Sequence, residues 1–69
     1  MPDLIVYTLR DCPTCARAKA DLKADGVDFE EREIDDNPVY YEEAVELGFS
    51  VPIIVRGAHV ETGWKGESG

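Results

Sequence analysis

The sequence predicts an α/β domain with elements in the order β-α-β-α-β-β and four strands in one mixed sheet. Three observations lead to this fold class. Two segments have a proline in the first turn of a helix and a glycine at its end. Short runs of strand-forming residues lie before, between and after these two segments. The chain has 69 residues, the size of one small domain, so we expect residues 1–69 to form a single domain.

The first third of the chain predicts a strand followed by a helix. Leu4–Tyr7 is a continuous apolar run, typical of a strand that is buried on both faces. After a loop over Thr8–Asp11, Pro13 opens a helix that runs to about Asp25 and ends at Gly26. Its spacing gives a narrow inward face, made of Cys15, Ala18 and Leu22.

The middle of the chain predicts a second strand and a second helix. Apolar and charged residues alternate imperfectly over Val27–Ile34, which favours an edge strand. Asn37 is a helix cap with Pro38 behind it, and Gly48 ends the helix. We expect its inward face to consist of Tyr40, Ala44 and Leu47.

The last third predicts a β-hairpin. Ile53–Val55 has the branched side chains of a strand, and Arg56–Ala58 turns the chain into a final strand over His59–Glu61. Thr62–Gly69 contains three glycines and no periodicity, so we expect a tail.

Charge and the N-terminal residues narrow the range of partners and compartments. The net charge of −8 argues against nucleic acid or an anionic membrane, because both select for Lys and Arg. Met1–Asp3 has no basic stretch, and the run Leu4–Leu9 is too short for a signal peptide or a membrane span. We therefore expect a cytoplasmic protein, in a reducing compartment where paired cysteines are catalytic or metal-binding rather than structural.

The two cysteines, Cys12 and Cys15, form a Cys-Pro-Thr-Cys motif that opens a helix directly after a buried strand. At the helix cap, the Cys12 sulfur accepts hydrogen bonds from the free amides of Thr14 and Cys15 and lies at the positive end of the helix dipole. Both effects lower the thiol pKa below its usual value of about 8.5 and favour the nucleophilic thiolate. Cys15 is one turn further, within reach of Cys12. The motif thus predicts thiol–disulfide exchange: Cys12 attacks a disulfide, and Cys15 then releases the reduced product.

Metal-binding readings of the cysteines remain as alternatives. A zinc site usually needs four ligands, and the chain offers two cysteines and the distant His59. An iron–sulfur cluster shared by two subunits would use Cys12 together with added thiols. A third alternative is a non-enzymatic adaptor, which the intact motif argues against.

The chain resembles glutaredoxins and closely related redoxins over nearly its whole length. The matching segments are Ile5–Thr8, Cys12–Cys15, Phe29–Glu30, Ile34–Asp35, Ser50–Ile54 and Gly63–Trp64. The resemblance implies a thioredoxin-like fold of minimal size, with the last helix short or absent because only Lys65–Gly69 remain. It also implies a cis bond between Val51 and Pro52 beside the reactive cysteine. The backbone of Val51 would then pair with that of the substrate.

The resemblance is incomplete where glutaredoxins hold glutathione. Members that use glutathione commonly have a Gly-Gly-Cys-Asp-like stretch after the last strand. Here Gly63 is kept, but the acidic residue is replaced within Glu61–Lys65. The pair Gly63–Trp64 is more similar to redoxins that thioredoxin reductase reduces and that serve ribonucleotide reductase. Trp64 either caps the core or lines the substrate groove. Arg10 binds a glycine carboxylate, steadies the thiolate, or is an exposed loop cation that does neither.

The sequence as a whole predicts a monomeric dithiol–disulfide oxidoreductase, with no bound cofactor or metal, that reduces protein or glutathione mixed disulfides. Its electrons would come from glutathione or from thioredoxin reductase. The expected catalytic residues are Cys12 and Cys15. The expected substrate-binding residues are Arg10, Pro13, Thr14, Val51, Pro52, Gly63 and Trp64.

Overall fold

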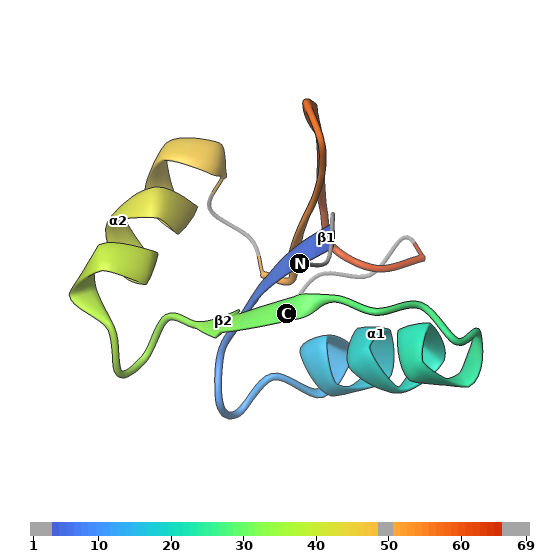
Figure 1. The fold of residues 1–69 in the computed structure, drawn as a ribbon. Coiled ribbons are helices and arrows are strands. Elements are labelled where there is room, and N and C mark those ends of the chain that lie inside the picture. Colours follow the sequence, from blue (N-terminus) through green and yellow to red (C-terminus); the bar gives the residue numbers. More distant parts are fainter. Residues whose placement is uncertain (1–3, 49–50, 66–69) are drawn as a thin grey trace.

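The computed structural model describes residues 4–48 and 51–65, and these form the expected α/β fold (Figure 1). The element order is β1 (Leu4–Thr8), α1 (Pro13–Ala24), β2 (Glu30–Glu33), α2 (Pro38–Leu47), β3 (Ile53–Arg56) and β4 (His59–Thr62). Residues 1–3, 49–50 and 66–69 lie outside the description, as do the predictions that fall on them: the N-terminal segment, Ser50 and the residues of a reduced final helix.

The four strands form one mixed sheet in the order β2-β1-β3-β4. β2 runs parallel to β1, whereas β3 runs antiparallel to both β1 and β4. In the register, Val6 lies opposite Glu31 of β2 and Ile54 of β3. β1 is therefore central and β2 is an edge strand, as the charged sequence of β2 predicted.

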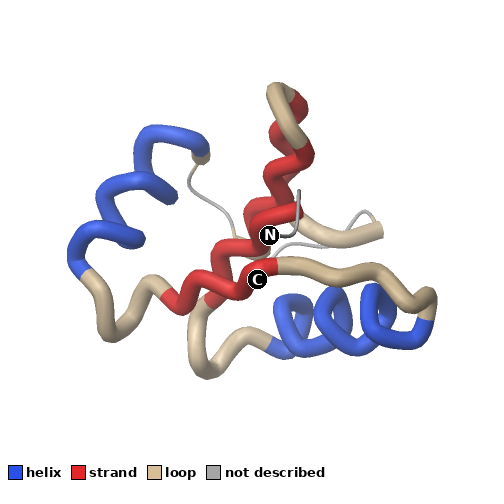
Figure 2. The backbone as a smooth tube through the Cα atoms, viewed as in Figure 1, coloured by secondary structure: helices blue, strands red, loops and turns tan. Residues whose placement is uncertain are grey.

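The two helices cover opposite faces of this sheet (Figure 2). Side chains alternate along a strand, so Ile53 and Ile54 face opposite sides. Ile54 joins a buried cluster on the α1 face, with Leu4, Val6 and Leu22 as its other members. Ile53 joins a second cluster on the α2 face, together with Tyr7, Cys12, Cys15, Ile34, Ala44 and Val51.

The sequence prediction of the second strand was too long. The predicted span Val27–Ile34 contains β2 only from Glu30 to Glu33. The cause lies in the end of α1, where Gly26 has a positive φ of 71° and the Val27 amide donates to the Leu22 carbonyl at 2.9 Å. The residues before Glu30 are therefore used to leave the helix. Thr8, expected in a loop, is instead the last residue of β1, and its carbonyl accepts from the Ile34 amide at 2.9 Å.

The inward face of α2 is also narrower than predicted. Tyr40 packs against the core and Ala44 is buried, but Leu47 is 36% exposed. The helix approaches the sheet along Ala44 and Gly48, one turn apart, and a Cβ on Gly48 would lie 2.8 Å from the Thr62 Cγ2 atom of β4. This close approach turns Leu47 to the side. Within residues 4–48 and 51–65, neither helix has the length and apolar character that crossing a membrane requires.

Candidate active site

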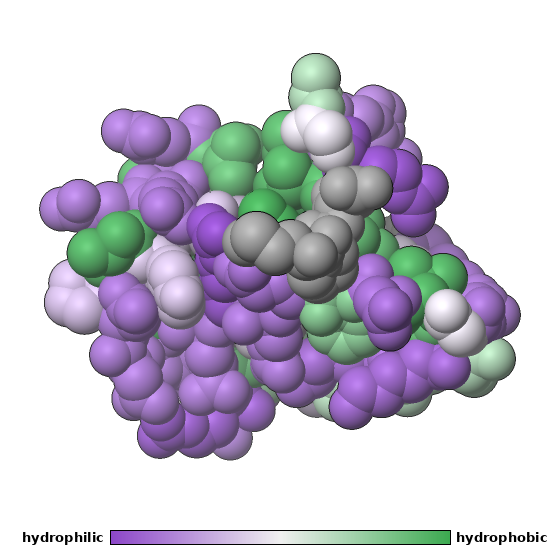
Figure 3. Space-filling model, viewed as in Figure 1, coloured by the Kyte–Doolittle hydropathy of each residue, from purple (hydrophilic) through white to green (hydrophobic). Residues whose placement is uncertain are grey.

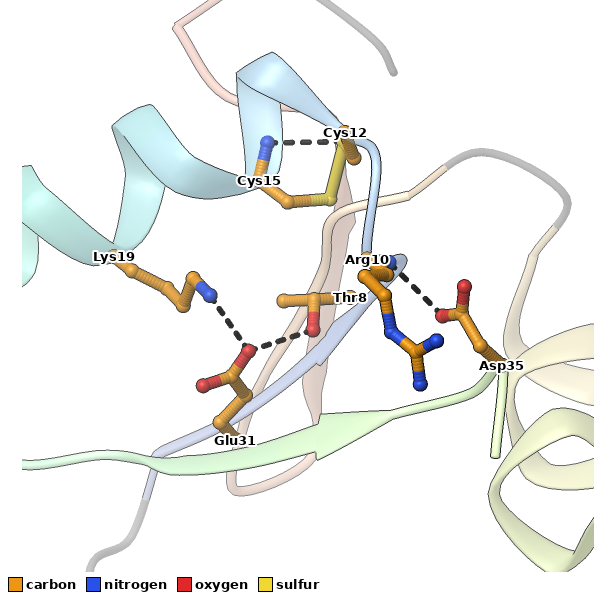
Figure 4. The surroundings of a disulfide bond; sticks show 7 residues. All are labelled: Thr8, Arg10, Cys12, Cys15, Lys19, Glu31 and Asp35. Atoms are coloured by element: carbon orange, nitrogen blue, oxygen red, sulfur yellow. Dashed lines mark hydrogen bonds and ion pairs between the residues drawn. A yellow bond between two sulfur atoms is a disulfide. The ribbon is translucent and has the colours of Figure 1, made fainter. Parts of the chain in front are cut away.

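The cysteine pair lies where β1 delivers the chain to the start of α1 (Figure 4). Cys12 is the N-cap residue with extended backbone angles, and Pro13 is the first residue of the helix. Cys12 and Cys15 form a disulfide with their Cα atoms 5.1 Å apart. The Cys15 amide donates a hydrogen bond to Cys12 Sγ at 3.0 Å. The helix start therefore presents a backbone donor to the sulfur of Cys12.

The local sequence explains this geometry, with one correction. An N-cap side chain accepts from the second or third helical amide, which here belong to Thr14 and Cys15. Both were expected to donate to Cys12, but within the described residues only the Cys15 amide does so. Thr14 is buried without that contact. Cys12 is 6% exposed and Cys15 only 1%, so Cys12 is the outer sulfur of the pair.

The segment before β3 lies beside the disulfide. Val51 is buried in the same apolar cluster as the two cysteines, and the Val51–Pro52 bond is cis, as the family resemblance implied. The Pro52 carbonyl accepts from the Gly63 amide at 2.8 Å. Gly63 itself has a positive φ of 81°, which suits a residue without a side chain. Val51 thus lies with the cysteines, and Gly63 is hydrogen-bonded to the adjacent Pro52.

Arg10 lies close to the motif but forms ion pairs away from it. Its guanidinium contacts Asp36 and lies 3.6 Å from Glu33, while its backbone amide donates to Asp35 Oδ1 at 2.9 Å. In Figure 4 the Arg10 side chain points away from both sulfur atoms. These acidic neighbours raise the pKa of the already cationic Arg10, the Asp36 contact most strongly. Among the described contacts of Arg10, none is to the sulfur of Cys12 or Cys15.

Trp64 packs on the α1 face, against the cluster that excludes the cysteines. Its indole Nε1 donates to Asp21 Oδ2 at 2.8 Å, and Lys65 Nζ lies 3.2 Å from the same oxygen. The indole hydrogen bond is the main cause that lowers the pKa of Asp21. Trp64 therefore caps the core, which was one of the two predicted placements, and fastens the chain after β4 to α1.

A polar network that was not predicted from the sequence joins Thr8 of β1, Lys19 of α1 and Glu31 of β2. Buried Thr8 donates from Oγ1 to Glu31 Oε2 at 2.9 Å, and Lys19 Nζ donates to the same oxygen at 2.7 Å (Figure 4). Burial raises the pKa of Glu31, but the bonds from Lys19 and Thr8 outweigh it and the pKa is lowered overall. The only sequence signal was the helical spacing of Lys19, one turn beyond Cys15.

A second network holds α2 to the sheet. Arg32 on β2 donates to Tyr7 Oη at 3.0 Å and to Glu43 Oε1 at 2.8 Å, and its guanidinium also contacts Glu30. The same guanidinium lies 5.6 Å and 5.3 Å from the ring centres of Tyr7 and Tyr40. Burial and the Glu43 bond raise the pKa of Tyr7. The network joins β1, β2 and α2.

Metal ligation has little support from the described side chains. Across residues 4–48 and 51–65, no three His, Cys, Asp or Glu side chains are grouped as ligands for an ion. His59 is exposed on β4, with Nε2 lying 3.0 Å from Glu61 Oε1. The zinc alternative thus has two sulfurs and no further ligand near them in this part of the chain.

Comparisons with known proteins agree with this architecture. A sequence model of the glutaredoxin family matches residues 4–60. Glutaredoxin 3 of Escherichia coli is 44% identical over 46 residues, which make up 67% of this chain and 55% of that protein. The chain spans about half the length of the curated relatives it matches.

Solved structures give the same result over more of the chain. NrdH-redoxin from Escherichia coli, described as a glutaredoxin-like protein with a thioredoxin-like activity profile, superimposes with a TM-score of 0.82 at 28% identity. The superposition covers 90% of this chain and 83% of NrdH-redoxin. A glutaredoxin from Archaeoglobus fulgidus gives a TM-score of 0.79 at 30% identity, over 94% of this chain and 78% of that one. The family match spans most of the described fold and includes both cysteines, and the chain belongs to the glutaredoxin family.

Proposed function

We propose that this chain is a dithiol–disulfide oxidoreductase that reduces protein or glutathione mixed disulfides through Cys12 and Cys15. One observation carries the proposal: the two sulfurs are bonded at the start of α1, where the Cys15 amide donates to Cys12 Sγ. A bridge between residues this close in sequence closes a very small loop and stabilises a fold little. We therefore assign this disulfide to redox chemistry rather than to stabilising the fold.

The proposed cycle has two exchange steps. The Cys12 thiolate attacks one sulfur of the substrate disulfide, a Cys12–substrate bond forms, and the other substrate sulfur leaves as a thiolate. Cys15 then loses its proton and attacks Cys12 Sγ, which expels the second substrate sulfur and forms the Cys12–Cys15 bond. Two electrons pass from the protein to the substrate. The cycle uses no bound cofactor, since both electrons move between sulfur atoms.

Each cysteine suits one of these steps by its position. Cys12 is the outer sulfur, and the positive end of the α1 dipole and the Cys15 amide favour its thiolate. Cys15 is 1% exposed, so it meets Cys12 but not a second substrate. A reducing compartment such as the cytoplasm suits the cycle, because the dithiol must be restored after each turnover.

We assign substrate alignment to the backbone of Val51. Among the described residues, its amide and carbonyl have no hydrogen-bond partner, although its side chain is buried against the cysteines. An extended substrate segment can therefore pair with it, as a short added strand beside Cys12.

A second candidate concerns the source of electrons and the client. Two features favour a redoxin that thioredoxin reductase reduces and that serves ribonucleotide reductase. The Arg10 guanidinium pairs with Glu33 and Asp36, and the Trp64 indole is bonded to Asp21 on α1, so glutathione would have to compete with these contacts to use either side chain. The structural neighbour NrdH-redoxin, with its thioredoxin-like activity profile, points in the same direction.

The test compares electron donors for the oxidised protein. We would follow NADPH consumption with glutathione and glutathione reductase in one reaction and with thioredoxin reductase in the other, using insulin as the final disulfide. The proposal requires turnover with at least one donor and none for Cys12→Ser. Turnover with thioredoxin reductase alone selects the second candidate. Turnover that persists without Cys12 contradicts the mechanism.

A further inference from the structure

An apolar groove of about 200 Å³ opens between α2 and the end of β1. Its walls include Leu9 after β1, Tyr41 and Val45 on one side of α2, and Val51 and Ile53 at the sheet. Leu9, Tyr41 and Val45 are 39%, 55% and 41% exposed. Three large apolar side chains thus remain in contact with solvent around a single hollow.

The groove adjoins the buried cluster that contains the cysteines, although neither cysteine lines it. Val51 and Ile53 belong to the same buried cluster as Cys12 and Cys15. Leu9 lies three residues before Cys12 on the loop that leads to the motif. Val51 both lines the groove and packs in the cluster with Cys12, so a polypeptide aligned on Val51 would have neighbouring side chains close to the groove.

The helix that forms one wall of the groove, together with the residues that lead into it from β2, is strongly acidic. The stretch from Glu33 to Glu46 contains six acidic residues and no lysine or arginine. Arg10 and Arg32, from outside the stretch, pair with part of this charge. Glu42 and Glu46 are exposed and have no ion-pair partner among residues 4–48 and 51–65. Hydrophilic side chains cover much of the visible face of α2 in Figure 3, with apolar surface between this helix and the hairpin.

We propose that this groove selects the substrate: it binds a bulky apolar side chain next to the reactive cysteine of a polypeptide disulfide that also has a lysine or arginine nearby. The apolar side chain fills the space between Leu9 and Val45. The cation lies along Glu42 and Glu46 on the outer side of α2. Glutathione lacks an apolar side chain and is anionic, so it is the weaker substrate. This inference builds on the proposed function, since it concerns the client of the same dithiol.

The probes are symmetrical disulfides of short, blocked peptides that differ at two positions beside the cysteine. One position is Leu or Ser and the other is Lys or Glu, which gives four peptides, with glutathione disulfide as a fifth substrate. Pre-reduced protein in excess converts each disulfide to two thiols and becomes oxidised, so no further reductant is needed. Acid quenching and chromatography give the single-turnover rate constant. We expect the Leu and Lys peptide to react about tenfold faster than the Ser and Glu peptide.

Two variants of α2 make a matched pair for the apolar side. Val45 lines the groove, whereas Val39 is 59% exposed on the same helix and does not line it. Val45→Asn should reduce the preference for Leu over Ser to below about twofold. Val39→Asn should leave it unchanged. Urea unfolding of both variants verifies that the helix is retained.

A second pair tests the acidic side. Glu42→Gln with Glu46→Gln removes two charges from α2, and Asp25→Asn with Asp28→Asn removes two from the loop that follows α1. Only the first pair should abolish the preference for Lys over Glu, and added salt should reduce that preference in the wild-type protein.

The outcomes separate this inference from the function beneath it. Equal rate constants for the four peptides, all dependent on Cys12, overturn the groove proposal and leave the oxidoreductase intact. A faster reaction of glutathione disulfide than of the Leu and Lys peptide overturns it as well. Reaction of every substrate without Cys12 removes the proposed function itself. Equal effects of the Val45 and Val39 changes show that the groove does not select.

Discussion

The two faces of the sheet pack to different degrees. On the α1 face, Leu4, Val6, Leu22 and Ile54 form a small cluster that Phe29 and Trp64 close from the side. On the α2 face, the larger cluster contains the disulfide, yet the groove beside it leaves Leu9, Tyr41 and Val45 exposed. In a chain of 69 residues, apolar burial is limited. The exposed apolar side chains around the groove thus lie on the face whose buried cluster contains the cysteines.

The difference follows from what covers each face. α1 presents Ala18 and Leu22 to the sheet, and Trp64 packs beside it through its bond to Asp21. α2 presents only Ala44 as a buried residue and is held mainly through polar contacts of Arg32. Because α2 contacts the core through Ala44 and the partly buried Tyr40, the side of the helix that carries Tyr41 and Val45 borders the groove. We infer that the α1 face mainly stabilises the fold and that the α2 face mainly binds substrate.

The largest effect is expected on the α2 face. Cys12→Ser should reduce disulfide exchange to the uncatalysed background, because a hydroxyl is not ionised at neutral pH and cannot replace the thiolate. Cys15→Ser should instead accumulate a mixed disulfide, since the first step is intact and the second is lost. Mass spectrometry after mixing with a peptide disulfide distinguishes the two. A stable adduct on Cys12→Ser, through Cys15, would reverse the assigned roles.

The next effect concerns the α1 face. Trp64→Ala should lower the free energy of unfolding by about 2 kcal/mol, less than for a fully buried tryptophan, because Trp64 is only half-buried. Trp64→Phe should cost less, since it keeps most of the packing and loses only the bond to Asp21. Urea unfolding gives both values. The single-turnover rate constant of each folded variant should stay within about twofold of wild type. A large loss of rate in Trp64→Phe would instead assign this residue to the substrate groove.

The sequence predicted what short-range signals encode. Pro13 and the Asn37–Pro38 pair set the starts of the two helices, and the Cys-Pro-Thr-Cys spacing set the site. Caps and a four-residue motif depend on neighbouring residues, so a single sequence contains them. The cis bond at Pro52 was predicted from the family resemblance, because the local sequence alone does not determine it.

What the sequence did not predict depends on distant contacts. The acidic partners of Arg10 could not be predicted, because Asp35 and Asp36 follow β2, about 25 residues away; its proposed role in binding substrate stays a prediction. The limits of β2 depended on how α1 ends, and the exposure of Leu47 on the approach of Gly48 to β4. The groove arises from the gap between α2 and the end of β1, and such a gap has no pattern in sequence.

Neighbouring isoleucines on β3 give a sharper comparison of the two faces. Ile53 is 1% exposed and lines the groove, and Ile54 is 4% exposed on the α1 face. Ile53→Val and Ile54→Val each remove one methylene group and should each lower the free energy of unfolding by about 1 kcal/mol. Only Ile53→Val should also change the preference for Leu over Ser peptides. If Ile54→Val changes that preference equally, the faces are not separate in function.

The smallest effect concerns acid stability and Glu31, on the α1 face. In the folded protein the pKa of Glu31 is lowered from its ordinary value of 4.5. Burial acts to raise this pKa, but the hydrogen bonds from Lys19 and Thr8 lower it by more. A lowered folded pKa means that the carboxylate stabilises the fold fully above pH 4.5 and that this contribution is lost as the pH falls through the folded pKa. Glu31→Gln keeps an acceptor for Thr8 but loses the charge. Between pH 6 and about pH 3, the free energy of unfolding of this variant should therefore fall less than that of the wild-type protein. The difference between the two falls should be less than about 1 kcal/mol. Asp21→Asn is the control, because it removes a different carboxylate whose pKa is also lowered and leaves Glu31 in place. It shows how far the loss of any such carboxylate changes stability in acid. If the free energy of unfolding of Glu31→Gln depends on pH as it does in the wild-type protein, the charge of Glu31 in the network with Thr8 and Lys19 adds nothing to stability.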